Sequence, residues 1–276
     1  MTGEDADFPI HLEGCRRLQK PPQYSNALTD ANHRQVNSIC HFLSLLARTT
    51  SHELQPRVWH PDHPLFDPPQ FDNHERSIEY IYGVTPVLGN QLDKTCQIAE
   101  YLSFYQGSEI PEILLQACED LRNELSSWNV ESEPFHSIRP EQATALEVIR
   151  CQARAFHSAV VIFYYRTVEN YYPLNLEGVV HAVWENLTNA ENLKDSLMGG
   201  EKRAAPMSWP AFIAACEAAD RQPWVEWWVR IQGYRVGNFA RQWKVIRDIW
   251  AIMDADGNVA GCRDALKRSG NLILPI

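Results

Sequence analysis

The stretch over residues 208–250 constrains the fold most, because its apolar residues recur at helical spacing. One segment follows the spacing i, i+3, i+4, i+7, with Trp224, Trp227, Trp228 and Ile231. The next follows i, i+4, i+7, i+11, with Phe239, Trp243, Ile246 and Trp250. Each set forms one stripe of an amphipathic helix. The alanine-rich segment before them predicts another helix with little bulk, so the stretch predicts three helices packed around tryptophan.

Capping and helix-breaking residues in this stretch predict where its helices begin and end. Ser208 precedes Trp209-Pro210, which is the pattern of an N-cap followed by proline in the first helical turn. Gly233 ends or bends the second helix. Asn238 is placed to cap the third helix.

The rest of the chain also reads as helices. Helical spacing predicts helices over residues 31–48, 75–106 with an interruption at 83–86, 110–128 capped by Ser108, 139–169, 176–187 and 260–268. Residues 51–74 are rich in proline and predict a loop that is ordered or partly mobile. We therefore expect an all-α, irregular multi-helix single domain of about ten helices over residues 31–276. An N-terminal arm (residues 1–30) precedes it, and the apolar tail NLILPI should dock in a groove.

The charge balance limits the partners of the chain. Its 25 basic and 35 acidic residues give a formal charge of −10, and the basic residues are not clustered. Polyphosphate binding requires such clusters, so we expect no direct nucleic-acid binding and no anionic membrane partner. The N-terminus has no apolar signal region, and no apolar run approaches the length of a membrane span. We expect a cytoplasmic or nuclear protein.

Cysteine and histidine spacing argues against a metal site. Seven scattered cysteines lack a C-x-x-C pair, so we expect free thiols and no structural zinc. The histidine-rich segment lacks the H-E-x-x-H and zinc-finger spacings, and we interpret its candidate ligands as surface residues: His52, His60, Asp62, His63, Asp67 and His74. The segment from Asp254 to Gly257 departs from a calcium loop and predicts a turn.

The stretch described first also resembles a known family. The run W-P-x-F-I-A-x-C-E-A, the tryptophan-rich helix, the Gly-Asn pair and the closing D-I-W resemble the C-terminal end of the regulatory domain of fungal zinc-cluster transcription factors. Upstream, Tyr82-Gly83-Val84 with Leu88 is similar to the Y-G-x-x-x-x-L segment of that domain. The resemblance covers about residues 78–250 and implies an all-helical effector domain. The six-cysteine cluster of those factors is absent from the sequence.

No cofactor motif is present: the sequence contains no G-x-G-x-x-G, P-loop or G-x-S-x-G pattern, and we expect no cofactor. Polar and aromatic residues on otherwise apolar helices are the site candidates. As hydrogen-bond donors in catalysis we select His157, Tyr164, His181 and Arg235, and as ligand-binding residues Phe156, Trp184, Trp227 and Asn238. Structural interpretations are also open: His157 as a satisfied core or boundary histidine, and Glu217 and Asn238 as helix caps or as partners of Arg221 or Arg235.

Two hypotheses of different classes remain. In the first, which we favour, a freestanding copy of the domain is a cofactor-free enzyme. It holds a hydrophobic natural-product intermediate for an intramolecular cyclisation of the Diels–Alder type or an isomerisation, in fungal secondary metabolism. Near-attack positioning and one hydrogen-bond donor would supply the catalysis. In the second, the chain is the effector or dimerisation domain of a fungal transcriptional regulator and binds a small molecule or a protein. A hydrophobic small molecule is the expected partner of the enzyme, and a homodimer is possible.

Overall fold

Helices form all the regular secondary structure of the described residues in this computed structural model, which are 30–51, 54–71, 77–135, 142–169, 176–197, 204–256, 261–271 and 273–275. In chain order they are α2 (Asp30–Thr49), α3 (Ser77–Tyr82), α4 (Pro86–Phe104), α5 (Glu112–Ser127), η2 (Val130–Ser132), α6 (Ala143–Thr167), α7 (Glu177–Leu197), α8 (Trp209–Glu217), α9 (Gln222–Ile231), η4 (Gln232–Tyr234), α10 (Gly237–Ala255) and α11 (Cys262–Ser269). The all-α prediction is confirmed. Apart from Asp30, the predicted arm lies outside the described residues.

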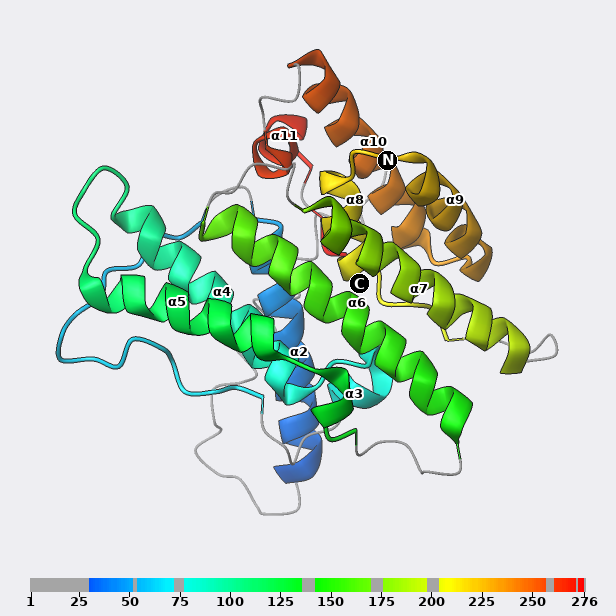
Figure 1. Ribbon diagram of the computed structural model, residues 1–276, viewed down its shortest axis with the longest axis horizontal. Coiled ribbons are helices and arrows are strands. Elements are labelled where there is room, and N and C mark those ends of the chain that lie inside the picture. The colour runs from blue at the N-terminus through cyan, green and yellow to red at the C-terminus, as the bar shows by residue number, and fades with distance from the viewer. Residues whose placement is uncertain are drawn as a thin grey trace.

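Helix α6 is the centre of the molecule (Figure 1), packing against α4, α7 and α8. Its alanines 153, 155 and 159 are fully buried and let neighbouring helices approach closely. Ile162 and Tyr164 are also fully buried, although they are two residues apart and therefore lie on opposite sides of the helix. Because α6 is covered on several sides, its apolar residues are not confined to one stripe. The sequence predicts this helix over 139–169, and the structure has it over Ala143–Thr167.

The tryptophan-rich unit has the predicted helices α8, α9 and α10. Trp224, Trp227 and Trp228 are buried on one stripe of α9. The rings of Trp228 and Trp243 are stacked with centroids 6.3 Å apart, which joins α9 to α10. Trp250 Nε1 donates a hydrogen bond of 2.8 Å to the Ala215 carbonyl and so joins α10 to α8. The prediction that aromatic stripes specify this packing is confirmed.

One predicted helix cap is confirmed in position, and two are wrong. Ser208 occupies the N-cap position of α8, but its side chain makes no capping bond, and its buried Oγ has no hydrogen-bond partner in the described structure. Asn238 lies inside α10, whose N-cap is Val236, because its side chain bonds the C-terminal tail instead. The N-cap of α5 is Pro111, not Ser108. Asn238 shows that a side chain which reaches a tertiary partner is lost to the local cap.

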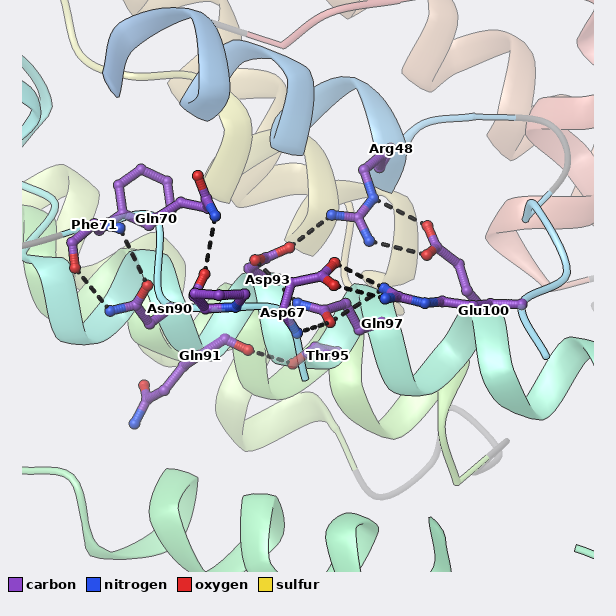
Figure 2. A network of polar contacts seen from close by, with 12 residues as sticks. Arg48, Asp67, Gln70, Phe71, Asn90, Gln91, Asp93, Thr95, Gln97 and Glu100 are labelled. Atoms are coloured by element: carbon purple, nitrogen blue, oxygen red, sulfur yellow. Dashed lines mark hydrogen bonds and ion pairs between the residues drawn. The ribbon is translucent and has the colours of Figure 1, made fainter. Parts of the chain in front are cut away.

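The N-terminal half is fastened by a polar network on α4 (Figure 2). Arg48 of α2 contacts Asp93 at 2.6 Å and Glu100 at 3.0 Å. The proline-rich segment 54–71 is ordered against the same helix, because Arg57 pairs with Asp67 at 2.6 Å while the Asp67 amide donates to Gln97. Over its described residues, the proline-rich segment is therefore an ordered loop, which is one of the two predicted alternatives.

The C-terminal tail docks as predicted over residues 273–275, which are buried. Thr50 Oγ1 donates a 2.6 Å hydrogen bond to the Ile273 carbonyl, and Asn238 Nδ2 donates a 2.8 Å bond to the Leu274 carbonyl. The tail therefore joins the end of α2 to the start of α10. Among the helices of the described residues, none combines the length and the apolar character that crossing a membrane requires.

Candidate functional site

A cleft of about 320 Å³ lies between α5, α6 and α7. This volume is at the small end of the range for small-molecule sites. It is lined by side chains of three helices and the residue after α5: Arg122, Leu125, Ser126, Trp128, His157, Ser158, Val161, Tyr164, Tyr165, Gly178, Val179 and Ala182. The α6 residues follow helical spacing and so share one side of that helix.

Small residues on α7 keep the cleft open. Gly178 and Ala182 are four residues apart and therefore share one face of α7. A Cβ built on Gly178 would meet no atom within 4 Å. The space beside this part of α7 is therefore available to a ligand rather than filled by a side chain.

His157 forms the aromatic wall of the cleft together with Trp128. The two rings are stacked with centroids 4.2 Å apart and an interplanar angle of 16°. His157 Nε2 lies 2.9 Å from the Leu125 carbonyl, and because a carbonyl only accepts, Nε2 carries the proton. Burial lowers the pKa of His157 to about 4. The ring is therefore neutral near pH 7, and its Nδ1 is a hydrogen-bond acceptor.

Tyr164 also lines the cleft, but its hydroxyl is already engaged. The oxygen lies 2.8 Å from the Cys118 carbonyl and 2.9 Å from a Glu169 carboxylate oxygen, and both groups are acceptors. Arg122 Nε holds the same carboxylate at 2.6 Å. Burial and then the hydrogen bond to Glu169 raise the pKa of Tyr164. The hydroxyl has one proton, and it is donated within the protein.

The cleft contains two of the eight predicted site residues, His157 and Tyr164. Phe156 lies in the core against Trp209, with ring centroids 4.8 Å apart. Trp227 is buried in the tryptophan-rich unit, and Asn238 binds the tail. The remaining three lie outside the cleft: Trp184, whose Nε1 donates to the Pro223 carbonyl, and the exposed His181 and Arg235.

The cleft lies where α6 faces α5 and α7, and it does not include the tryptophan-rich unit, to which the candidate Trp227 belongs. The sequence-based selection missed Trp128 and Gly178, which line the cleft. The available signals were the spacing of His157, Val161 and Tyr164 on α6 and the pair of small residues on α7. The predicted partners of Glu217 are also wrong, because Glu217 pairs with Arg166 at 3.0 Å.

Within the described part of the chain, no three His, Cys, Asp or Glu side chains lie close enough together to hold a metal ion. In the proline-rich segment, Asp67 is paired with Arg57, and the rings of His60 and His63 are 6.3 Å apart. The other two histidines considered, His52 and His74, lie outside the described residues. The cleft offers an aromatic wall, aliphatic contacts and, at His157 Nδ1, a hydrogen-bond acceptor.

Comparison with known proteins identifies a similarity at the level of the family. A family model described as a fungal specific transcription factor domain matches residues 1–275. This covers much more of the chain than the motifs in residues 78–250. No curated protein and no solved structure matches the chain significantly.

Proposed function

The chain belongs to the family of fungal specific transcription factor domains, and from this membership we propose that it is the effector domain of a fungal transcriptional regulator. The cleft between α5, α6 and α7 is the proposed receptor for a hydrophobic small molecule. The observation that carries this proposal is the stacked Trp128–His157 wall beside an open cavity of about 320 Å³. The regulator acts in the nucleus in this proposal, and homodimerisation stays a separate prediction.

The two predicted donors in the cleft favour binding over catalysis, because both are already engaged within the protein. A cofactor-free cyclase needs a donor aimed at the carbonyl of its substrate. The Nε2 proton of His157 is donated to Leu125, and the Tyr164 proton is donated to Cys118 or Glu169. Using either donor would first break a bond within the protein. The cyclase or isomerase hypothesis stays a prediction, and the effector function is the better supported one.

The lining defines the class of ligand. A flat apolar ring system fits against the Trp128–His157 wall, while Leu125, Val161 and Val179 supply aliphatic contacts. The acceptor at His157 Nδ1 selects a ligand that has one hydroxyl or N–H donor. A ligand bridging α5 and α7 would favour one relative placement of these helices, and α7 in turn packs against α8 and α9. Such differential binding is how an effector shifts a conformational equilibrium.

The test uses 2-naphthol, an apolar ring system with one donor, and measures binding by calorimetry. Gly178→Leu should fill the cleft and weaken binding at least tenfold, while the added helix propensity keeps α7 folded. Gly237→Leu is the matched control, because Gly237 is also helical with open space around it and lies outside the cleft. Equal binding by Gly178→Leu and the unmodified chain would refute the proposed site.

A second comparison tests the acceptor. The unmodified chain should bind 2-naphthol more tightly than 2-methoxynaphthalene by about 1 kcal/mol, which is the net value of one hydrogen bond. His157→Phe keeps an aromatic ring but removes Nδ1, so this variant should not discriminate between the two compounds. Discrimination that persists in His157→Phe would assign the acceptor elsewhere.

A further inference from the structure

A second cavity, of about 50 Å³, lies on the opposite side of α6 from the cleft. Arg166 on its α6 wall follows His157 by nine positions (166 minus 157), which is about two and a half helical turns. The other walls come from the end of α2, from α8 and from α11. The volume exceeds the roughly 10–15 Å³ that a single water requires, so the cavity admits a ligand of a few non-hydrogen atoms.

Glu217 of α8 brings an unsatisfied acceptor to the lining of this cavity. Its side chain is only 6% exposed, and its Oε2 lies 3.0 Å from Arg166 Nε in an ion pair. That contact lacks the geometry of a hydrogen bond, so within the described structure the buried Oε2 accepts none. Burial raises the pKa of Glu217 although Arg166 acts to lower it, which means that the carboxylate is poorly solvated. Because buried polar atoms are normally hydrogen-bonded, Oε2 would gain from a donor.

The hydroxyl groups of the cavity do not supply this donor. Thr49, Thr50 and Thr167 line the cavity, and each donates to a backbone carbonyl at 2.6 or 2.7 Å. A hydroxyl group has one proton to donate, so all three are already used. The donor for Glu217 Oε2 therefore has to come from a molecule that enters the cavity.

The charges around the cavity favour a neutral ligand. Arg166 is paired with Glu217, and although burial lowers the pKa of Arg263, the carboxylates of Asp264 and Glu100 act to raise it. An anion would be repelled by the exposed lone pair of Glu217 Oε2, and a cation by the two arginines. Arg263 still has donors to offer a neutral acceptor, because a guanidinium has five N–H groups and its hydrogen bond of 3.3 Å to a backbone carbonyl uses one.

We propose that this second cavity binds a small, neutral primary carboxamide, whose N–H group donates to Glu217 Oε2 and whose carbonyl oxygen accepts from Arg263. A carboxamide combines a donor and an acceptor without a net charge, which is what these two residues require. Its short alkyl group packs on Phe212, Ile213 and Leu266, which also line the cavity. The small volume excludes large amides. This site is independent of the ligand proposed for the cleft between α5, α6 and α7.

The test titrates the full chain, at constant ionic strength, with three compounds that differ in one group. Propionamide has the amide nitrogen, butanone has a methyl group in its place, and propionate has a charged oxygen there. Backbone amide chemical shifts of Ile213, Glu217 and Arg263 report binding. Propionamide should give saturable shifts, and butanone should bind at least tenfold more weakly because it has no donor for the charged acceptor. Propionate should also bind at least tenfold more weakly, because Glu217 repels it.

Two outcomes of this titration would overturn the proposal. One is equal affinity for propionamide and butanone, because the donor would then contribute nothing. The other is the absence of any saturable shift with propionamide, because the cavity would then hold water alone.

Variants assign the binding to this cavity. Glu217→Gln keeps the shape of the side chain but removes its charge, so the preference for propionamide over propionate should be lost, a change that reduced stability alone would not produce. An unchanged preference would contradict the role of Oε2. Ile213→Phe should fill the cavity and weaken propionamide binding at least tenfold, and Ile113→Phe, at an exposed position on α5, is the matched control. Gly178→Leu should leave propionamide binding unchanged, so a failure of this site can be told from a failure of the cleft.

Discussion

Trp128, the residue that follows α5, stacks on His157 of α6 with an interplanar angle of 16°. Both rings are fixed by hydrogen bonds outside the stack: Trp128 Nε1 donates to Glu133, and His157 Nε2 donates to the Leu125 carbonyl. The wall of the cleft is therefore formed before a ligand arrives. A preformed wall reduces the ordering cost of binding.

His157 should make the stability of the protein depend on pH. Its pKa falls from 6.5 to about 4 on folding, because burial disfavours the charged ring. As the pH drops below 6.5, the unfolded chain takes up this proton first, so the folded state loses stability by up to about 1.4 kcal/mol per pH unit. The loss from this group continues down to about pH 4.

The measurement is urea unfolding at pH 7, 6 and 5 for the unmodified chain and for His157→Gln, which cannot titrate. The difference in unfolding free energy between the two should shift in favour of His157→Gln as the pH falls. His181→Gln, at an exposed position, is the control. A difference that does not change with pH would contradict the neutral, buried state of His157.

Removing Arg48 should cost much more than removing the nearby Lys94, because the carboxylate partners of Arg48 are more deeply buried. Arg48→Met leaves Asp93, whose side chain is 8% exposed, and Glu100 without their cation, with an expected loss of about 3–5 kcal/mol. Lys94→Met breaks a solvent-exposed pair with Glu124 and should cost at most about 1 kcal/mol. Denaturant unfolding of both variants measures the contrast. Similar losses would show that the network in Figure 2 is not a major source of stability.

The hydroxyl group of Thr49 should be required for full stability of the fold, because it accepts a buried hydrogen bond. Trp209 Nε1 donates to Thr49 Oγ1 at 2.8 Å, and both residues are buried. Thr49→Val keeps the shape but leaves the indole N–H unsatisfied, at a cost of about 1–3 kcal/mol. Thr49→Ser keeps the hydroxyl and should retain more of the stability. The hydrogen bond would be unimportant if the valine and serine variants unfolded at the same denaturant concentration.

The C-terminal tail should contribute to global stability. Ile273 is 7% exposed, so Ile273→Ala removes buried apolar surface and should cost about 2 kcal/mol or more. Val229 is 59% exposed, and Val229→Ala should change stability by no more than about 0.5 kcal/mol. Thermal unfolding compares the two. A tail that does not pack in solution would make the two variants alike.

His157 and Tyr164, two of the eight predicted site residues, both line the cleft, because they lie on one side of a long helix whose period is readable in the sequence. The sequence could not identify Trp128 as the partner of His157. These residues are 29 positions apart in sequence (157 minus 128), and their contact depends on how α5 crosses α6. Periodicity fixes which residues share a helix face but not which helix covers that face.

Helical spacing by itself determined the all-α class, most of the helices and the tryptophan stripes of α9 and α10, since these depend on residues close together in the chain. Tertiary packing alone decided which polar side chains would be available. Asn238 binds the tail instead of capping α10, Glu217 pairs with Arg166, and the Tyr164 proton is donated within the protein. Each of these outcomes depends on a partner in another element of the fold. Helix period contains no information about such partners.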